Sequence, residues 1–531
     1  MKHRLKRTAS MACCFVAGLV VNGVAQDTRP NILFILADDQ AIESITAYNT
    51  WLKDYTQTPN IDRLANEGML FKYMCSNNSV CEPSRASIIT GQYSHVHGVT
   101  GNAGSLPINP DSPWVSKKLQ RNGYQTWLVG KWHLESEPEG FTDYRVVSGQ
   151  GSYFDPKYIG PSGIVENVTG YSSDKYTDKA LEWLDGRDRT KPFCMMLHFK
   201  AAHYPFDCAP RHENLLDGVT VVEPATLYED LDAANSWLKP QWPKRTKFHL
   251  VQAPNGTDPD DPNVTYYNRN KDELEPHDPN DMTDRTRVAY QHLIKNYIRC
   301  VAGIDDNVGR MIEYLENEGI LDQTVIIYTA DQGYWIGQHG FYDKRLIYDG
   351  SLRTPFIVRY PPMVAAGIKN RDMCSNVDIA PTMLELAEIN PAVKMQGRSL
   401  VPVLQGNTPA DWRTAAWYNY PGKPQNYGIR TREYTLVHDH DNADIELYDN
   451  IQDKHQTVSV HNDPAYSNVL QELEIELQQA MEEADITQEE LDAEGEKNGG
   501  TTGIPVVRAD DVSLPSKGCA QNDAGDANLK G

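Results

Sequence analysis

Four continuous apolar segments of strand length recur along the chain, and polar residues follow each of them directly. They are residues 31–37, 125–129, 192–199 and 324–330. Unbroken apolar runs are typical of parallel strands that are covered on both faces, and segments with helical periodicity lie between them. We therefore expect an α/β fold with a large, mostly parallel central sheet covered by helices. In such a sheet, ligands bind beyond the carboxyl ends of the strands, so the four polar clusters should share one edge.

Helical periodicity fills much of the sequence between these strands. We predict helices over 60–67, 174–185, about 286–318 and 376–388, the first three ending at Gly68, Gly186 and Gly319. Residues 205–285 are rich in Pro, Asp and Asn and show little periodicity, which predicts long excursions over the sheet.

The pattern changes after residue 400. Short alternating segments at 430–437 and 444–448 precede a helix with an apolar stripe. This predicts a small C-terminal α+β subdomain over 401–500, with a short antiparallel sheet. The preceding residues, 26–400, should form the main domain, and residues 501–531 a polar tail.

The amino-terminal 25 residues are typical of a secretory signal peptide. A basic start leads into an apolar stretch that ends near Gly23 and Ala25, which predicts cleavage close to Gln26. A membrane anchor is the alternative, but the apolar stretch is short and Asn22 interrupts it. We expect export and no membrane partner after cleavage.

The formal net charge of the chain is −23, and loss of the signal peptide would remove four cationic residues and make the protein more acidic still. Such an acidic protein is not expected to bind nucleic acid. An anionic small substrate is compatible with this charge only if its pocket is locally positive. Seven cysteines remain after residue 25, and their irregular spacing does not predict a disulfide framework.

Carboxylates gather at the ends of the first and fourth apolar segments. Asp38 and Asp39 follow the first, and Asp331 and Gln332 follow the fourth. Helix capping could explain one such pair. Two pairs at one edge would bring three carboxylates together, which is unfavourable without a cation. The all-oxygen set predicts Ca²⁺, with Mg²⁺ as the less favoured alternative, because Zn²⁺ prefers imidazole and thiolate ligands.

A thiol is placed at the start of a predicted short helix in the sequence Cys-Glu-Pro-Ser-Arg-Ala-Ser-Ile-Ile-Thr-Gly, residues 81–91. Pro83 suits the first turn and Gly91 the position just past the end, so Cys81 should face the positive pole of the helix. Arg85 follows four residues later. A buried structural cysteine is the alternative interpretation.

Two lysines and two histidines complete the candidate chemistry. Lys131 and His133 follow the second apolar segment, and because one residue separates them we expect both to point the same way. His203 follows the third segment, and Lys344 lies in a loop 13 residues after Asp331. Each could alone be a solvated or core residue, but together with Arg85 they make a pocket for an anionic ester.

With these motifs, the chain resembles the type I sulfatases of the alkaline-phosphatase-like superfamily. The motifs that carry the resemblance are Asn-Ile-Leu-Phe-Ile-Leu-Ala-Asp-Asp (31–39), Cys-Glu-Pro-Ser-Arg (81–85), Gly-Lys-Trp-His (130–133), Ala-His-Tyr-Pro (202–205), Thr-Ala-Asp-Gln-Gly (329–333) and Lys-Arg-Leu-Ile-Tyr-Asp (344–349). The resemblance implies an alkaline-phosphatase-like sandwich and a sulfatase catalytic domain over 26–400.

The resemblance also implies how the site works. Residue 81 would be converted to formylglycine by a maturation enzyme, and the hydrated aldehyde would attack sulfur. Ca²⁺ would be held by Asp38, Asp39, residue 81, Asp331 and Gln332, although many relatives have Asn at the last position. Arg85 and Lys131 would hold the hydrated aldehyde, His133 would take its second proton, His203 would protonate the leaving alcohol, and Lys344 would bind sulfate oxygens.

Residues 331–340 and 352–359 are similar to sulfatases that act on sugars, including N-acetylglucosamine 6-sulfate. We therefore predict a sulfated carbohydrate substrate, either a glycosaminoglycan or an algal-type polysaccharide fragment. Side chains that could face it are Trp132, Tyr334, Trp335, His339, Lys344 and Arg353, and a core position is the alternative for the aromatic ones.

Two other functions stay open on the sequence. One is a formylglycine-dependent phosphonate or phosphodiester hydrolase, and the other is an inactive sulfated-glycan-binding protein with an unmodified Cys81. The sequon Asn77-Asn-Ser79 ends two residues before Cys81, and a glycan on Asn77 would crowd the nucleophile. This favours a bacterial host that exports the protein to the periplasm or medium.

Overall fold

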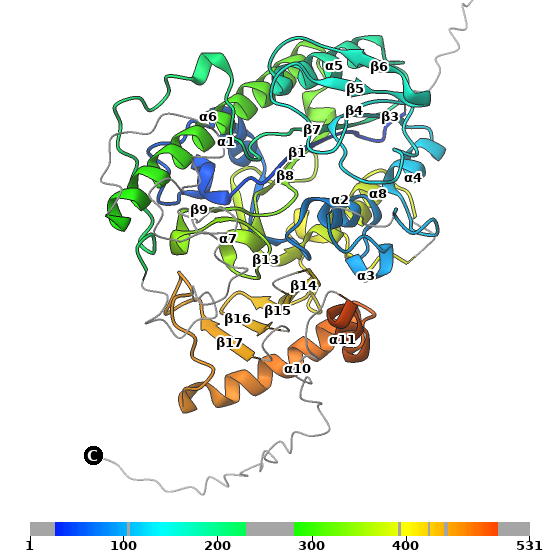
Figure 1. Ribbon diagram of the computed structural model, residues 1–531. Helices are drawn as coiled ribbons and strands as arrows, with labels where there is room; N and C mark the ends of the chain where they lie inside the picture. Colours follow the sequence, from blue (N-terminus) through cyan, green and yellow to red (C-terminus); the bar gives the residue numbers. More distant parts are fainter. Residues whose placement is uncertain are drawn as a thin grey trace, which may run out of the picture.

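Eleven strands form the central sheet of the computed structural model (Figure 1). Five neighbouring strands in the middle run parallel, in the order β8 (Thr324–Ala330), β1 (Asn31–Ala37), β7 (Phe193–His198), β3 (Gln125–Lys131) and β4 (Asp143–Val147). Four of these are the predicted apolar segments, so the predicted parallel sheet is confirmed. Their carboxyl ends meet at one edge.

Further strands extend the sheet on both sides. Beyond β8 lie β12, β2 and β11, with β13 also paired to β2, and beyond β4 lie β5 and β6. Their bounds are β2 Met69–Cys75, β5 Lys157–Ile159, β6 Val165–Asn167, β11 Arg353–Thr354, β12 Phe356–Arg359 and β13 Ile368–Ser375. A separate hairpin joins β9 (Trp335–Ile336) to β10 (Tyr342–Asp343).

The structure describes residues 27–102, 107–229, 281–390, 394–422, 425–439 and 444–497. The predicted signal peptide and tail, and most of the predicted excursions between 205 and 285, lie outside these stretches. Within them, the six cysteines are free thiols. No helix in this part of the chain combines the length and apolar character needed to cross a bilayer.

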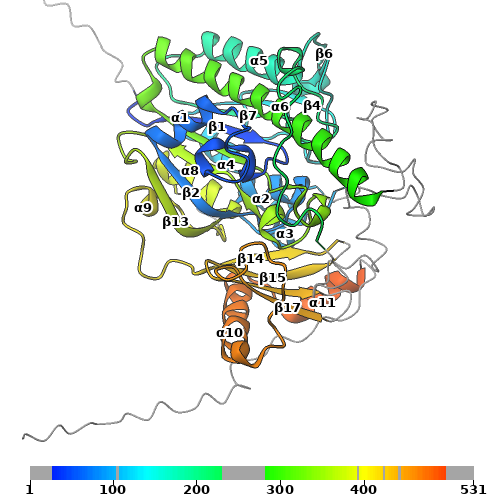
Figure 2. The same cartoon turned by 90° about the vertical axis from the view of Figure 1, so that its left-hand side faces the viewer.

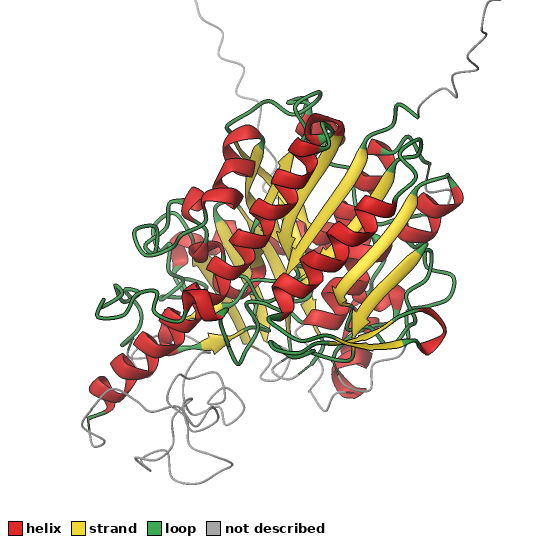
Figure 3. Cartoon of the chain, turned by 90° about the horizontal axis from the view of Figure 1, so that it is seen from above, coloured by secondary structure: helices red, strands yellow, loops and turns green. Residues whose placement is uncertain are grey.

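Helices cover both faces of the central sheet (Figure 3). Because side chains alternate along a strand, Leu33 and Ile35 of β1 enter one core, while Ile32 and Phe34 enter the other. The first core is closed by α1 (Pro59–Glu67), α5 (Ser172–Gly186) and α6 (Met282–Asn317). The second is closed by α2 (Cys81–Thr90), α4 (Val115–Arg121), α8 (Ile379–Leu386) and α9 (Val401–Leu404). The other α-helices of the described residues are α3 (Ser94–His97), α7 (Asp349–Leu352), α10 (Ser467–Glu483) and α11 (Gln488–Lys497).

The predicted C-terminal antiparallel sheet is also confirmed. It consists of β14 (Ala415–Tyr420), β15 (Asn426–Thr431), β16 (Tyr434–Asp439) and β17 (Asp444–Asp449), in sequence order. One face packs against α10 through a buried stripe of Leu473, Leu477 and Met481. Figure 2 shows this sheet below the central one, with α10 on its outer side.

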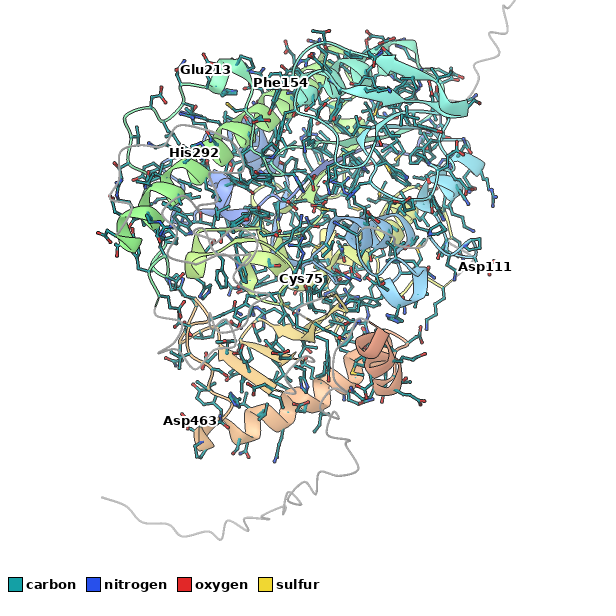
Figure 4. The ribbon with its side chains drawn as sticks, viewed as in Figure 1. Cys75, Asp111, Phe154, Glu213, His292 and Asp463 are labelled. Atoms are coloured by element: carbon teal, nitrogen blue, oxygen red, sulfur yellow. The ribbon has the colours of Figure 1, made fainter. Side chains whose placement is uncertain are left out.

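An apolar cluster joins the two sheets. Cys75, at the end of β2, is labelled in Figure 4 between the central sheet and the C-terminal strands. It belongs to a buried cluster that includes Trp335 and Tyr348 from the central part and Tyr418 and Tyr448 from the C-terminal sheet. The C-terminal sheet therefore supports the loops at the carboxyl edge.

An ion-pair network reinforces this junction at Asp349, the first residue of α7. Its carboxylate accepts from Arg430 of β15 at 2.6 and 3.0 Å and from Arg353 of β11 at 3.1 Å. Burial opposes ionisation, but the two guanidinium groups hold the pKa of Asp349 well below its ordinary value of 3.8. One carboxylate thus ties the C-terminal sheet to the central one.

We expect Asp349→Ala to lower the free energy of unfolding by about 3 kcal/mol, because it leaves buried Arg430 without its counterion. Urea denaturation at neutral pH measures this loss. Because the pKa of Asp349 is depressed on folding, its contribution is present above pH 3.8 and disappears as the pH falls toward the folded-state pKa. The exposed control Asp54→Ala should change stability by less than about 0.5 kcal/mol. Equal stability of Asp349→Ala and wild type at neutral pH would contradict this account.

Candidate active site

The ends of β1 and β8 bring four oxygen-bearing side chains together. Backbone pairing of these neighbouring strands places Ala37 opposite Ala330, so the residues that follow also lie side by side. The backbone N–H of Asp39 donates to the Asp331 carboxylate at 3.0 Å, and the Gln332 amide nitrogen donates to the Asp39 carboxylate. All four side chains, those of Asp38, Asp39, Asp331 and Gln332, are buried.

Each of these carboxylates contacts a cation from another element. Lys131 of β3 donates to Asp38, and Lys344, which follows β10, donates to Asp39. The Arg85 guanidinium donates to Asp331 at 3.0 Å. The three cations are themselves buried, so this edge of the sheet holds a dense group of charges in a largely water-free setting.

These charges give the three carboxylates different pKa values. Burial raises the pKa of Asp38, but the charges of Lys131 and Arg85 outweigh it and hold the pKa well below the ordinary range. Burial, with the negative charge of Asp38, raises the pKa of Asp331 to about 7. The pKa of Asp39 is raised by burial as well, despite Lys344. The cations therefore do not fully compensate the three carboxylates.

The donor set fits a divalent cation. Ligand atoms of Asp38, Cys81 and Asp331 all lie within 4.8 Å of one another. The Oε1 atom of Gln332 is buried and has no hydrogen-bond partner among the described residues. Carboxylate oxygens with an unused amide oxygen are ligands that Ca²⁺ prefers, and the charge of the ion would lower the raised pKa values of Asp39 and Asp331.

Cys81 begins α2 and lies against this group. Its Sγ is 3.6 Å from Asp38 Oδ1, 3.1 Å from Lys344 Nζ and 3.8 Å from the Gln332 amide nitrogen. The predicted helix is confirmed, and Gly91 ends it with a φ of 67°. Burial raises the pKa of the Cys81 thiol to about 12, although Lys131 and Lys344 oppose this. The unmodified side chain is therefore a protonated thiol and a weak nucleophile at neutral pH.

Lys131 and His133 meet at a residue that the sequence analysis did not single out. The Gln150 Oε1 atom accepts from Lys131 at 2.6 Å, and its amide nitrogen lies 3.3 Å from His133 Nε2. The prediction that Lys131 and His133 share an extended segment is wrong, because β3 ends at Lys131 and His133 has a φ of 51°. Their side chains converge through Gln150 instead of through strand alternation.

Gly130, within β3, permits a close approach of β3 to β7. Gly130 has a φ of 104°, and a Cβ at this position would lie 1.9 Å from the carbonyl oxygen of His198. Glycine is therefore required for β3 to pass this close to β7 while placing Lys131 at the edge.

His203 approaches the group from the segment after β7. Its Nδ1 atom pairs with the carbonyl oxygen of Tyr204 at 2.7 Å, and its Nε2 atom is 3.6 Å from Asp39 Oδ2. Burial lowers the pKa of His203 well below the ordinary range, and although Asp38 opposes this, Lys131 and Lys344 add to it. In the absence of an anion this imidazole is neutral.

The comparisons with known proteins agree with this geometry. The family model described as Sulfatase matches residues 30–389, which is most of the chain. The chain belongs to the sulfatase family. A second model, described as N-sulphoglucosamine sulphohydrolase, C-terminal, matches residues 337–483 of this sulfatase. The enzyme is thus a hydrolase of sulfate esters.

Two relatives and one solved structure are particularly similar to this sulfatase. An N-acetylglucosamine-6-O-sulfatase of Bacteroides thetaiotaomicron is 37% identical over 489 residues, covering 84% of this chain and 85% of that protein. The human N-acetylglucosamine-6-sulfatase is 28% identical over 440 residues, covering 77% and 70%. A protein solved in complex with its substrate, D-glucosamine-2-N,6-O-disulfate, superposes with a TM-score of 0.76 at 34% identity, covering 86% of this chain and 98% of that one.

The predicted substrate-binding residues lie in three different places. Lys344 is in the group around Cys81. His339 and Arg353 line a separate cavity of about 530 Å³, where His339 Nδ1 pairs with Glu229 at 2.5 Å and Arg353 with Asp349. Trp132 is buried against Trp114 and donates to the carbonyl oxygen of Ser136. Substrate contact by His339, Arg353 and Trp132 stays a prediction.

Gln150 and Glu82 are the site residues that sequence reasoning missed. Gln150 follows β4 at the same edge of the sheet, between Gly149 and Gly151, which both have positive φ. A polar residue between two glycines at a strand end was a usable signal. Glu82 occupies the variable position of the Cys-Glu-Pro-Ser-Arg motif, and its Oε1 atom lies 3.4 Å from His133 Nε2. Nothing in the motif predicts this contact.

We expect Ca²⁺ to stabilise the sulfatase and Asp331→Asn to reduce that effect, because the substitution removes one ligand charge. A free Ca²⁺ concentration 100-fold above Kd should raise the free energy of unfolding by about 2.7 kcal/mol. Urea denaturation with and without Ca²⁺ measures this. The exposed control Asp54→Asn should keep the full increment, and Mg²⁺ should give a smaller one. If Ca²⁺ stabilised Asp331→Asn and wild type equally, the Ca²⁺ site would not include Asp331.

Proposed function

We propose that this sulfatase removes the 6-O-sulfate from N-acetylglucosamine or glucosamine units of a sulfated carbohydrate. Support comes from the 37%-identical N-acetylglucosamine-6-O-sulfatase and from the solved relative whose substrate is D-glucosamine-2-N,6-O-disulfate. The observation that carries the proposal is the buried group in which Cys81 Sγ lies beside both Asp38 and Lys344. This group brings together a nucleophile position at residue 81, an anion-binding lysine and a cation-binding carboxylate.

We further propose that residue 81 acts after conversion to formylglycine by a maturation enzyme. The high pKa of the buried thiol supports this, since an unmodified Cys81 would stay protonated. The hydrated aldehyde supplies two hydroxyl groups on one carbon, one to attack sulfur and the other to expel sulfate. Arg85 and Lys131, which pair with Asp331 and Asp38 in the group around Cys81, would hold the hydrated aldehyde. Ca²⁺, held by Asp38, Asp39, residue 81, Asp331 and Gln332, would supply positive charge to its oxygens.

The two histidines suit opposite roles in this proposal. Burial, with the charges of Lys131 and Arg85, lowers the pKa of His133 to about 3, so this imidazole is neutral. The negative charge of a bound sulfate ester would raise that pKa and let His133 take a proton. His203 would donate a proton to the departing sugar oxygen. It can carry that proton once a sulfate ester adds negative charge beside it, because a nearby anion raises the pKa of an imidazole. Lys344 would bind the sulfate oxygens.

The domain boundaries and the location belong to the same proposal. Residues 26–400 would form the catalytic domain and 401–500 the C-terminal subdomain, after removal of signal peptide 1–25. The basic and apolar start of the sequence supports export to the periplasm or the medium of a bacterium. The extracellular sulfatase of Drosophila melanogaster, 26% identical over 402 residues, is compatible with such a location.

We expect Cys81→Ala to fold normally and to lose all detectable sulfate release from N-acetylglucosamine 6-sulfate, because the methyl group of alanine has no hydroxyl that could attack sulfur. Ion chromatography of released sulfate and circular dichroism provide the two measurements. Wild type should act on the 6-sulfate much faster than on the matching 6-phosphate. A preference for the phosphate would favour the phosphonate or phosphodiester hydrolase. Sulfate release by Cys81→Ala would overturn the role of residue 81. The protein would instead be an inactive glycan-binding protein if wild type bound the sugar, kept an intact Cys81 thiol and released no sulfate.

We expect His203→Ala to lose activity selectively on substrates with poor leaving groups. A general acid contributes about 100-fold or more when the leaving oxygen needs a proton. The kcat for N-acetylglucosamine 6-sulfate should therefore fall about 100-fold, whereas the kcat for an activated nitrophenyl sulfate should fall much less. Steady-state kinetics on both esters of His203→Ala and wild type provide the comparison. Equal losses on the two substrates would assign His203 another role.

A further inference from the structure

Four cations gather beside β2 in a protein that is strongly acidic overall. The Lys72 ammonium donates to the carbonyl oxygen of Tyr48 at 3.1 Å, and Arg353 donates to the carbonyl oxygen of Lys72 at 2.6 Å. Burial and the positive charges of Lys369, Arg353 and Arg371 lower the pKa of Lys72 to about 8. Among the described residues, no carboxylate pairs with Lys72. Its charge is therefore uncompensated, which favours the binding of an anion here.

The ring of Tyr73, the next residue of β2, contacts three guanidinium groups. Those of Arg353, Arg371 and Arg430 lie 5.2, 5.6 and 5.7 Å from the centre of the ring. Asp349 pairs with both Arg353 and Arg430, whereas Arg371 donates to the Tyr73 hydroxyl at 3.3 Å. One carboxylate is thus shared by two of the arginines, and the cluster carries excess positive charge.

Lys72 and Arg353 line the cavity of about 530 Å³, and no residue of the group around Cys81 does. Trp51, which is partly exposed, forms another part of its wall. Glu43 lines it as well, and the Oε2 atom of this side chain is buried and has no hydrogen-bond partner among the described residues. The cavity therefore combines an aromatic face, an unused acceptor and uncompensated cations.

This combination suits a sugar that carries a sulfate group. An indole can pack against the sugar ring, and a carboxyl oxygen can accept from a hydroxyl. An ammonium or guanidinium can donate charge-assisted hydrogen bonds to sulfate oxygens. Of the other carboxylates that line the cavity, Asp349 is bound by two arginines and Glu223 accepts from the Tyr228 hydroxyl at 3.0 Å.

We propose that this cavity is a second binding site for the substrate, in which Trp51 contacts a sugar ring, Glu43 accepts from its hydroxyl and Lys72 binds its sulfate. The site takes one sulfated unit of a longer chain, apart from the unit whose sulfate is released at residue 81. Arg353 then contacts substrate in this cavity and not beside Cys81. The inference rests on the proposed function, because it assumes a sulfated carbohydrate chain as substrate.

The first test measures binding without turnover. In Cys81→Ala protein, Lys72→Gln should weaken the binding of a heparin octasaccharide about tenfold, because a charge-assisted hydrogen bond to sulfate is lost. Isothermal titration calorimetry gives the Kd. Lys72→Arg keeps the charge and should stay within about threefold of the parent Cys81→Ala protein. The control Lys394→Gln removes the same charge from an exposed lysine and should change the Kd less than about twofold.

A second pair of measurements identifies the groups that are recognised. The Kd of a fully desulfated octasaccharide should not respond to Lys72→Gln, since no sulfate is left to bind. Trp51→Ala should instead weaken the binding of the sulfated and the desulfated chain alike, because packing of an indole on a sugar ring does not depend on sulfate.

A double-mutant cycle tests whether the cavity is separate from the group around Cys81. Independent contacts add in free energy. Lys72→Gln should therefore cost about tenfold in affinity both in the Cys81→Ala parent and in a Cys81→Ala protein that also carries Lys344→Ala. Circular dichroism checks that each variant is folded.

Three results would overturn the proposal. One is equal affinity of Lys72→Gln and its parent for the sulfated octasaccharide. The second is an equal loss in Lys394→Gln, which would indicate non-specific attraction. The third is disappearance of the Lys72→Gln effect in the Lys344→Ala background, which would assign Lys72 to the catalytic group. A matured wild type that releases no sulfate would instead contradict the proposed function and leave these binding results readable.

Discussion

The site depends on the burial of three carboxylates at the ends of two neighbouring strands. Asp38, Asp39 and Asp331 are removed from water, and Lys131, Lys344 and Arg85 are buried with them. With all six ionised, these formal charges cancel. A bound Ca²⁺ would leave the group with two positive charges, which would attract the single negative charge of a sulfate ester and match the two charges of released sulfate. A protein that is strongly acidic overall could in this way bind an anion, since the local balance and not the net charge of −23 decides the sign.

Strand order makes this convergence possible. Because β8, β1, β7 and β3 are parallel neighbours, four segments separated by up to about 300 residues deliver their side chains to one edge. The C-terminal sheet adds support from outside through the cluster around Cys75 and through Asp349, which binds arginines of both sheets. The loop that carries Lys344 lies next to this junction, so the stability of the C-terminal part and the placement of Lys344 are linked.

Sequence patterning was sufficient for the sheet and for most of the residues around Cys81. Continuous apolar runs predicted the parallel strands, and their polar ends predicted which side chains meet. Sequence patterning failed where the backbone departs from regular helix or strand geometry. Lys131 and His133 could not be placed by alternation because His133 has a positive φ. The contact of Glu82 with His133 depends on the start of α2 and the loop after β3 meeting in space, which no local pattern encodes. Trp132 was ambiguous because an indole suits both a core and a sugar.

The most direct test of the central claim is a crystal structure of the protein purified with Ca²⁺. The account predicts one cation bound by oxygens of Asp38, Asp39, Asp331 and Gln332 at about 2.3–2.6 Å, with Lys131 and Lys344 turned away from the carboxylates toward residue 81. Electron density that shows the lysines still paired with Asp38 and Asp39, and no cation between the carboxylates at saturating Ca²⁺, would contradict it.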